Sequence, residues 1–430
     1  MNNKKHIVII GAGFAGLKVA RTLNNNVHYS ITLLDKNNYH QFQPLLYQVA
    51  MANLDASNIS FPLRTIFQKS TNVSIRIDTV TNIDTAKKIV TTQKAEFIYD
   101  YLIIATGATT NYFGNTSIQE NTFPMKSTWE ALQIRNTLLQ HFEDAMTIQS
   151  FEHEKVLSVV IVGGGPTGVE LSGALAEMKR DTLPFEYPEL DFEKMKIYLI
   201  EGSSKLLASM SSVSSQKSRE YLEKMGVIVK TNTIVKACDG SSVTLQDSSS
   251  IPSTFVIWAA GVKGNPPPGL NPSLITKSNQ ITTDIYNRAL FCDAVFAIGD
   301  IAFIPTDQYP NGFPQLASVA IDQAKNVAAN FIRMSQQKTI QAFHYVNRGS
   351  MATVGRNKAV VDLAKPNLSF QGFFAWLLWM TLHLFLLIGF KNRIVVFINW
   401  IYKYFTNRQS LSLLFEPLAR KRNADDKLNH

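Results

Sequence analysis

The stretch from Lys5 to Gly16, KHIVIIGAGFAG, decides the fold of this chain. Its first half is a continuous, mostly β-branched apolar run, which is typical of a strand buried in a parallel sheet. A glycine loop and a helical pattern through Leu23 follow, and a second strand, predicted over residues 30–34, ends at Asp35. The order of strand, glycine loop, helix, strand and acid predicts a dinucleotide-binding βαβ unit.

Each part of this loop has a physical role. Gly11 makes the tight turn, Gly13 lets a pyrophosphate approach the backbone, and Gly16 lets helix and strand pack closely. The phosphates would lie at the positive end of the helix, and Asp35 can accept hydrogen bonds from the ribose hydroxyls. The alternative is a purely structural glycine turn, which the flanking strand, helix and acid disfavour.

The same pattern recurs further along the chain. A strand is predicted over residues 156–162, the loop GGGPTG occupies residues 163–168, and a helical pattern follows. The next strand, residues 196–200, ends at the acid Glu201, and we interpret residues 181–193 as a loop inserted before it. The two glycine loops begin 152 positions apart, a period too long for a solenoid repeat, which indicates a duplicated domain.

Two dinucleotide-binding units imply two dinucleotides. Because hydride must pass from a nicotinamide to a different carrier, the predicted pair is FAD and NADH. The carboxylate of Glu201 would repel a 2′-phosphate and so favours NADH over NADPH, while Lys205, nearby in sequence, weakens this preference.

The composition narrows the alternatives. An apolar fraction of 45% in 430 residues suits a globular protein of two or three domains. The only cysteines, Cys238 and Cys292, lie far apart, which excludes a disulfide framework, a thiolate metal site and a redox-active disulfide. We therefore expect no metal centre and a reducing compartment.

The charge is concentrated near the C-terminus. The formal net charge is +9, and eight Lys/Arg against three Asp/Glu lie from Lys391 onward, beside the most apolar stretch of the chain. This placement favours an anionic membrane surface over nucleic acid. Lys4 and Lys5 precede only a short apolar run, so no signal peptide is expected.

Two apolar stretches in the C-terminal part suggest a membrane contact. Residues 373–390 would form a helix about 27 Å long, which is borderline for a span. His383 within this stretch and Lys391 after it disfavour burial in hydrocarbon, and residues 394–405 carry Trp, Tyr and Lys, the residue types of an interface. We expect helices lying in one leaflet; a spanning helix and a dimer interface or core are the alternatives. His383 is expected to pack rather than to bind a ligand.

Taken together, the motifs resemble those of the two-dinucleotide flavoprotein oxidoreductases. The set is GAGFAG with Asp35, ATG at 105–107, GGGPTGVE at 163–170, WAAGV at 258–262 and FAIGD at 296–300. Within that class, the run NYHQFQPLLYQVA at 38–50, the longer run GGGPTGVELSGALAE and the aromatic tail resemble the type II NADH dehydrogenases, the single-subunit NADH:quinone oxidoreductases. The resemblance extends from Lys5 to about Phe405.

The motifs and this resemblance predict an α/β fold with two Rossmann-type dinucleotide-binding domains, the second inserted in the first, plus a C-terminal membrane-anchoring segment. Residues 1–110 and 280–340 would form the FAD-binding domain. Residues 120–275 would form the NADH-binding domain, and residues 341–430 a cap and an amphipathic membrane anchor.

The resemblance also implies site residues. FAD contacts are expected at Gly11, Ala12, Gly13, Phe14, Ala15, Gly16, Asp35, Lys36, Val80, Thr106, Gly107, Asp300, Ala317 and Ser318. NADH contacts are expected at Gly163, Gly165, Thr167, Gly168, Glu201, Ala260 and Gly261. Glu170 matches the family's acidic residue near flavin and nicotinamide, and its catalytic role competes with simple stabilisation of the helix start.

One departure from the family concerns the quinone. The family's Ala-Gln-x-x-x-Gln pattern beside the flavin matches the segment from Ala317, where Ser318 and Asp322 replace the two glutamines. Gln315 or Gln323 could substitute for them. The predicted quinone site therefore consists of Ser318, Asp322 and Gln323.

The implied function is NADH:quinone oxidoreduction without proton pumping. Hydride would pass from NADH to the flavin N5, and two electrons would then pass to a membrane menaquinone or ubiquinone. The expected location is the cytoplasmic face of the bacterial inner membrane, and a homodimer is left open. One alternative is a flavin-bearing, membrane-associated NADH sensor or scaffold, supported only by Ser318 and Asp322. The other is a reductase for a soluble ferredoxin or rubredoxin, which leaves the aromatic tail unexplained.

Overall fold

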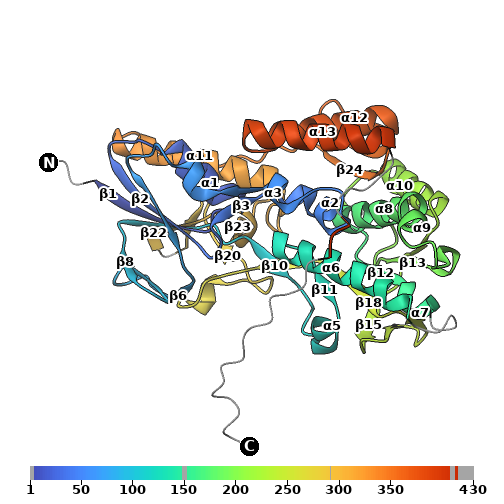
Figure 1. The fold of residues 1–430 in the computed structure, drawn as a ribbon. Helices are drawn as coiled ribbons and strands as arrows, with labels where there is room; N and C mark the ends of the chain where they lie inside the picture. The colour runs from blue at the N-terminus through green and yellow to red at the C-terminus, as the bar shows by residue number, and fades with distance from the viewer. Residues whose placement is uncertain (1–3, 148–152, 291, 407–411, 415–430) are drawn as a thin grey trace, which may run out of the picture.

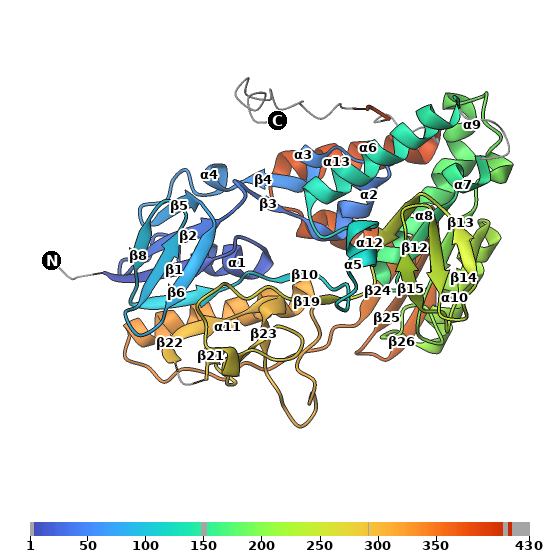
Figure 2. The ribbon, with the colours of Figure 1, turned by 90° about the horizontal axis from the view of Figure 1, so that it is seen from below.

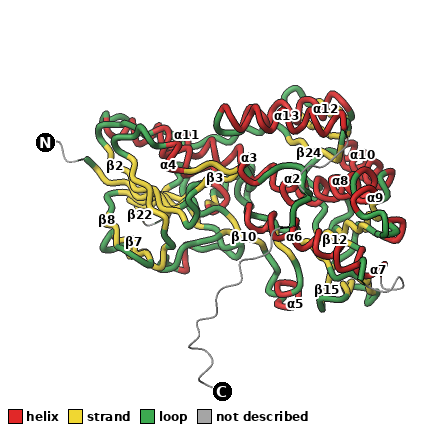
Figure 3. The backbone as a smooth tube through the Cα atoms, viewed as in Figure 1, coloured by secondary structure: helices red, strands yellow, loops and turns green. Residues whose placement is uncertain are grey.

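The computed structural model describes residues 4–147, 153–290, 292–406 and 412–414. Two parallel sheets lie at opposite ends of an elongated molecule, and helices α12 (Phe373–Leu386) and α13 (Phe390–Thr406) run side by side along one flank (Figure 1). Coloured by secondary structure, the backbone shows a group of strands at each end, with helices and the short strands labelled β3 and β10 between them (Figure 3).

The first sheet contains the strand that precedes the first glycine loop. Its order is β21-β22-β9-β1-β2-β5, and all neighbours are parallel except the edge strand β21. Its strands are β1 (Lys5–Ile10), β2 (Tyr29–Asp35), β5 (Val73–Ile77), β9 (Tyr101–Ile104), β21 (Arg288–Ala289) and β22 (Cys292–Ala297).

Both faces of this sheet are covered, which explains the unbroken apolar run of β1. Helices α1 (Phe14–Thr22) and α11 (Ala317–Ser335) cover one face, and their side chains join Ile9 in one apolar cluster. The antiparallel strands β6, β7 and β8 cover the other, where Ile83 and Val90 pack with Val8. Their bounds are β6 (Val80–Asp84), β7 (Ile89–Thr92) and β8 (Glu96–Ile98).

The second sheet is built from the chain between β9 and β21. Its order is β11-β18-β12-β13-β14, and every pair is parallel. Helices α6, α8 and α10 and the antiparallel strands β15 to β17 accompany it. The bounds are α6 (Thr128–Ala145), α8 (Pro166–Asp181), α10 (Ser212–Lys224), β11 (Phe123–Pro124), β12 (Val159–Val162), β13 (Ile197–Ile200), β14 (Val227–Lys230), β15 (Val235–Cys238), β16 (Ser242–Leu245), β17 (Ser250–Pro252) and β18 (Phe255–Trp258).

Two segments connect the sheets, and they pair with each other. Strand β10 (Ala108–Thr110) leaves the first unit, and strand β19 (Val262–Gly264) returns to it, antiparallel to β10. The structure thus agrees with an inserted second unit, while the residue limits given above for the domains stay a prediction.

The C-terminal part adds a three-stranded antiparallel sheet beside the second unit (Figure 2). It consists of β24 (Ser350–Gly355), β25 (Lys358–Leu363) and β26 (Leu368–Gln371). Helix α8 packs closely on β24, because a Cβ atom built on Gly173 would lie 1.6 Å from the carbonyl oxygen of Val354. Among the described residues, no helix has both the length and the apolar character to cross a bilayer.

Short elements complete the path of the chain. They are β3 (Tyr39–Gln41), η1 (Gln43–Leu45), α2 (Leu46–Ala50), α3 (Ala56–Ile59), β4 (Ser60–Pro62), α4 (Leu63–Ile66), α5 (Thr116–Glu120), α7 (His153–Leu157), α9 (Leu183–Glu186), η2 (Phe192–Lys194), η3 (Pro272–Leu274), β20 (Ile281–Thr282), η4 (Gly299–Ile301) and β23 (Ala302–Phe303).

Some predicted element bounds were wrong. Val156 and Leu157 end helix α7 instead of starting a strand, because a short apolar run fits a buried helix turn as well as a strand. The predicted inserted loop contains the short helix α9. The apolar stretch 373–390 is broken after Leu386, where Leu387 is extended and Gly389 adopts a positive φ of 84°.

Candidate functional site

The first glycine loop is shaped by steric contacts that exclude side chains. Gly11 has φ +100°, and a Cβ atom there would lie 2.4 Å from the carbonyl oxygen of Ala105. A Cβ atom on Gly16 would lie 1.9 Å from the carbonyl oxygen of Gly11. At Gly13, by contrast, no atom lies within 4 Å of the built Cβ position, so this side of the loop is open. The open side is where a pyrophosphate would approach.

Asp35 holds this loop from the neighbouring strand. Its Oδ2 accepts a hydrogen bond of 2.7 Å from the backbone N–H of Ala12, and its Oδ1 accepts one of 2.7 Å from that of Asn37. Burial raises the pKa of Asp35, and these two backbone hydrogen bonds oppose the rise. The carboxylate keeps lone pairs for a ribose hydroxyl.

Two buried polar atoms beside the loop fit a bound FAD. The Oγ1 of Thr106 and the Nε2 of His40 have no hydrogen-bond partner among the described residues. The other ring nitrogen of His40 lies 2.9 Å from the carbonyl oxygen of Ala12, and burial lowers the pKa of His40 to about 4, so the ring is neutral. Both atoms are therefore available for hydrogen bonds to a bound molecule.

The second glycine loop repeats this geometry. Gly163 has φ +113° and lies against Ala259, and a Cβ atom on Gly168 would lie 1.8 Å from the carbonyl oxygen of Gly163. Gly165 is open, as Gly13 is. Glu201 accepts a hydrogen bond of 2.6 Å from the N–H of Gly164, as Asp35 does from Ala12. This loop therefore suits the second dinucleotide.

The remaining predicted contacts surround the two loops. Around the first, Lys36 is exposed after β2, Val80 begins β6, and Ala317 begins α11. Burial raises the pKa of Asp300, in the turn η4, and the charge of Lys126 opposes part of that rise. Around the second, Thr167 lies in the first turn of α8, and Ala260 and Gly261 follow β18.

The ammonium group of Lys205 is held by a backbone carbonyl oxygen. Its Nζ donates a hydrogen bond of 3.0 Å to the carbonyl oxygen of Met210. The second oxygen of Glu201 accepts from the N–H of Ser203 at 2.7 Å. The negatively charged carboxylate of Glu201 is therefore fixed in place at the end of β13.

Glu170 lies on α8, in the wall of a pocket. Its Oε1 is 3.5 Å from the N–H of Thr353, and burial raises its pKa to about 8. Trp379 opposes part of that rise, and its indole nitrogen has no hydrogen-bond partner of good geometry among the described residues. A carboxyl group with a pKa near neutrality can hold or release a proton.

The pocket lies between the second unit and the C-terminal helices. Together with the solvent space at its mouth, it comprises about 590 Å³. Its walls come from α2, α8, the end of β24, α12 and α13, and the lining residues are Tyr47, Gln48, Asn53, Glu170, Ala174, Glu177, Thr353, Val354, Gly355, Arg356, Trp376, Trp379, Met380, Trp400, Lys403 and Tyr404.

The lining includes polar groups that sequence reasoning missed. Trp400 Nε1 donates to Gln48 Oε1 at 2.8 Å, and Gln48 Nε2 donates to the Tyr47 hydroxyl at 2.8 Å. The signal was present in the PLLYQVA run, where two polar residues interrupt an apolar stretch. Elsewhere in the wall, Lys403 Nζ lies 3.3 Å from Glu177 Oε2.

Aromatic and cationic side chains also meet at this pocket. The guanidinium of Arg356 lies 4.3 Å from the ring centre of Tyr404, and that ring stacks on Trp376 with centres 5.6 Å apart. His383 stacks on Trp379 with ring centres 4.0 Å apart. It thus packs against an aromatic side chain, as the sequence predicts.

The residues predicted to contact the quinone do not line this pocket. Ser318 is exposed, and Asp322 pairs with Arg348 and, at 3.0 Å, with Lys325. Gln323 is 1% exposed, and its Oε1 accepts a hydrogen bond of 2.6 Å from the N–H of Gly299. Their contact with a quinone stays a prediction.

The two loops with their acids define an α/β oxidoreductase that binds two dinucleotides. Residues 5–324 match the pyridine nucleotide-disulphide oxidoreductase family, and residues 347–409 match the NDH2 C-terminal domain. The chain belongs to the type II NADH:quinone oxidoreductases.

Individual relatives support this assignment. The type II NADH:quinone oxidoreductase Ndh of Mycobacterium tuberculosis is 32% identical, over 99% of this chain and 93% of the relative. NdhA of the same organism is 33% identical, over 93% and 87%. The fold is similar to the solved structure of NDH2 from Plasmodium falciparum in complex with NADH, with a TM-score of 0.88, 22% identity and coverage of 96% of this chain and 100% of the other. The predicted family, fold class, cofactors FAD and NADH, and function as an FAD-dependent NADH:quinone oxidoreductase without proton pumping are confirmed.

Proposed function

We propose that the chain oxidises NADH bound at the Gly163 loop and reduces a quinone bound in the pocket beside Glu170. FAD, held at the Gly11 loop, supplies the hydride acceptor and the two-electron donor when bound. The observation that carries the proposal is the position of the pocket. It lies between α8, which starts at the second dinucleotide loop, and the aromatic faces of α12 and α13.

Glu170 is proposed as the proton donor for the quinone. Reduction of a quinone to a quinol consumes two protons, and the carboxyl group of Glu170 lines the pocket. Because its pKa is about 8, most of these groups carry a proton at pH 7. A donor whose pKa lies near the working pH is efficient in both releasing and regaining a proton.

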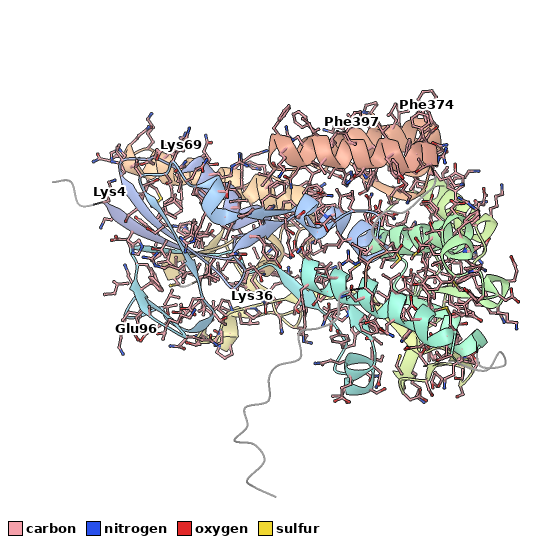
Figure 4. All side chains as sticks on the ribbon, viewed as in Figure 1. Lys4, Lys36, Lys69, Glu96, Phe374 and Phe397 are labelled. Atoms are coloured by element: carbon pink, nitrogen blue, oxygen red, sulfur yellow. The ribbon has the colours of Figure 1, made fainter. Side chains whose placement is uncertain are left out.

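The outer faces of α12 and α13 are proposed to rest on an anionic lipid surface. Phe374 and Phe397 point away from the body of the protein (Figure 4). The exposed apolar side chains of the two helices include Phe374, Leu377, Leu378, Phe385, Phe390, Phe397, Ile398, Ile401 and Phe405. Their inner faces line the pocket, so a lipid-dissolved quinone would reach it between the helices.

The proposal also includes the identity of the quinone, the location of the protein and its oligomeric state. They are a menaquinone or ubiquinone as acceptor, a location on the cytoplasmic face of the bacterial inner membrane, and a homodimer as the alternative use of the apolar face. Lys391 and Arg393 would face the lipid headgroups. The basic residues from Arg408 onward lie outside the described residues.

The activity test uses purified, detergent-solubilised protein. NADH oxidation is followed at the nicotinamide absorption band with a short-chain menaquinone, a short-chain ubiquinone or no quinone. Oxidation that depends on quinone supports the proposal, and the faster quinone identifies the acceptor. If NADH reduces the flavin but no quinone reoxidises it, the quinone step is refuted. That result would favour a soluble electron acceptor or a role as an NADH sensor.

The lipid test measures sedimentation with vesicles containing anionic lipid. Binding is expected to fall when Phe374 and Phe397 are both replaced by Ser, with the flavin content unchanged. A vesicle-independent change in oligomeric state in this variant would instead indicate that a second copy of the chain covers the face.

A further inference from the structure

A buried chain of hydrogen bonds joins the last described helix to α2. Trp400 Nε1 donates to Gln48 Oε1 at 2.8 Å, and Gln48 Nε2 donates to the hydroxyl oxygen of Tyr47 at 2.8 Å. The three side chains are 8%, 7% and 6% exposed, respectively. All three line the pocket that contains Glu170.

The direction of this chain is fixed by chemistry. An indole N–H can only donate, so Gln48 must turn its amide oxygen toward Trp400. This settles which end of the amide is oxygen, a choice that is otherwise ambiguous. The amide nitrogen then faces Tyr47, and since an NH₂ group can only donate, the tyrosine oxygen must accept. The hydroxyl hydrogen of Tyr47 therefore points somewhere other than Gln48.

Nothing in the described part of the chain accepts that hydrogen. Among the described residues, the hydroxyl group of Tyr47 makes one hydrogen bond, and in that bond its oxygen accepts from Gln48. Burial and the charge of Glu170 raise the pKa of Tyr47 well above its usual value, so the hydroxyl keeps its proton. A buried donor without an acceptor is costly, and it is satisfied when a ligand presents an oxygen.

We infer that Tyr47 is a catalytic residue of the quinone half-reaction, donating a hydrogen bond to a carbonyl oxygen of the quinone, and that Trp400 and Gln48 are its positioning residues. The inference rests on the proposed quinone site. A quinone carbonyl oxygen gains negative charge as electrons arrive, and a donor fixed in advance stabilises that charge. Tyr47 keeps its proton throughout; the two electrons come from NADH through FAD, and the two protons of the quinol come from Glu170 and from solvent.

The first test is the substitution Tyr47→Phe in the FAD-loaded full chain. Anaerobic reduction of the flavin by NADH is expected to stay within about twofold of wild type, while reoxidation by a short-chain menaquinone slows by about 30-fold. Tyr402→Phe, which changes an exposed tyrosine on α13, is the matched control and is expected to leave both steps unchanged. Reoxidation of the Tyr47→Phe protein at the wild-type rate would overturn the inference.

The second test reverses the direction of the chain without touching Tyr47. In Gln48→Glu, carboxylate oxygens face both neighbours, so the tyrosine hydrogen is drawn away from the pocket. Reoxidation is expected to slow nearly as much as in Tyr47→Phe, and the double variant is expected to be no slower than the single ones. A Gln48→Glu protein with wild-type reoxidation, or effects of the two changes that simply multiply, would overturn the positioning role.

Failure of the underlying function gives a different pattern. If wild-type flavin is reduced by NADH but no quinone reoxidises it, the quinone site itself is refuted together with the role of Tyr47. If wild type turns over and only the variants fail to show the expected loss, the quinone site stands and the role of Tyr47 falls.

Discussion

The two dinucleotide-binding units hold their loops in the same way but with different residue pairs. In the first, the short acid Asp35 accepts from the N–H of Ala12 at 2.7 Å. In the second, the longer acid Glu201 accepts from the N–H of Gly164 at 2.6 Å. A Cβ atom on Gly164 would lie 2.9 Å from the Cβ of Glu201 and 2.6 Å from a methyl carbon of Leu206. In the second unit, Leu206 and the first side-chain carbons of Glu201 therefore occupy the space where the alanine methyl group lies in the first unit.

The glycines at the start and end of each loop differ from Gly164, because the atoms nearest to a Cβ atom on them would belong to the backbone and not to side chains. Those at the start and end of each loop lie against carbonyl groups that cannot move, at equivalent positions in both units. They are therefore expected to tolerate no side chain in either unit, whatever the acid.

The largest effects are expected from Gly16→Ala and Gly168→Ala. Each Cβ atom would lie within 2 Å of a backbone oxygen, at 1.9 Å and 1.8 Å. Gly16→Ala should abolish bound FAD, and Gly168→Ala should retain FAD but abolish its reduction by NADH. Flavin absorbance of the purified proteins and anaerobic NADH titration measure the two losses. Equal losses of FAD in both variants would show that the units do not act separately.

The second prediction concerns the position where the units diverge most. Glu170 on α8 corresponds to Lys18 on α1, seven residues after the first glycine of each loop. Glu170 lines the pocket, whereas Lys18 lies near Lys325 on α11, and burial together with that charge lowers the pKa of Lys18. Glu170→Gln is expected to slow flavin reoxidation by quinone about 100-fold at pH 7, while Lys18→Gln leaves it unchanged.

The raised pKa of Glu170 also predicts how the rate of flavin reoxidation depends on pH. The pKa of Glu170 is about 8 in the folded protein, raised by burial, so the proton needed for the quinone is lost as pH rises through that value. Wild-type reoxidation should therefore fall above pH 8, and the Glu170→Gln protein should show no such fall. A stopped-flow series from pH 6 to about 9.5 tests this; a parallel decline in both proteins would assign the ionisation to another group.

An intermediate effect is expected from Gly164→Ala. Its Cβ would meet side-chain atoms of Glu201 and Leu206, which can move, so the KM for NADH should rise about tenfold without loss of fold. Adding Leu206→Ala removes the closest of these contacts and should recover most of the loss. Steady-state kinetics of the single and double variants decide whether the two residues are coupled; additive effects would contradict the comparison drawn above.

The smallest effect is expected from Lys205→Ala. Because its ammonium group donates to the carbonyl oxygen of Met210, its removal should change the preference for NADH over NADPH by less than about twofold. The ratio of kcat/KM for the two nucleotides measures this. A larger change would show that Lys205 turns toward the ribose when nucleotide is bound.

The loops and their acids could be predicted from sequence because each unit is local. Strand, glycines, helix and acid lie within a few dozen residues, and the steric requirements at Gly11 and Gly163 allow few alternatives. The position of the acid Glu170 on a helix could be predicted equally well, because Glu170 directly follows the second loop.

The pocket could not be predicted, because its walls come from distant parts of the chain. Gln48 and Trp400 are 352 positions apart, and no local pattern links them. Ser318 and Asp322 show the reverse case. Their departure from the family was visible, but only the structure shows that Asp322 pairs with Arg348 and that neither residue lines the pocket.

The hydrogen bond between Trp400 and Gln48 has a consequence for biosynthesis. A nascent chain emerges from the ribosome N-terminus first, so both nucleotide loops are complete before α13 leaves the exit tunnel. Until then the pocket lacks the wall that Trp400, Lys403 and Tyr404 provide. Under the proposed function, the quinone site is thus completed after both dinucleotide loops, in the same step that brings the apolar face of α13 out of the ribosome.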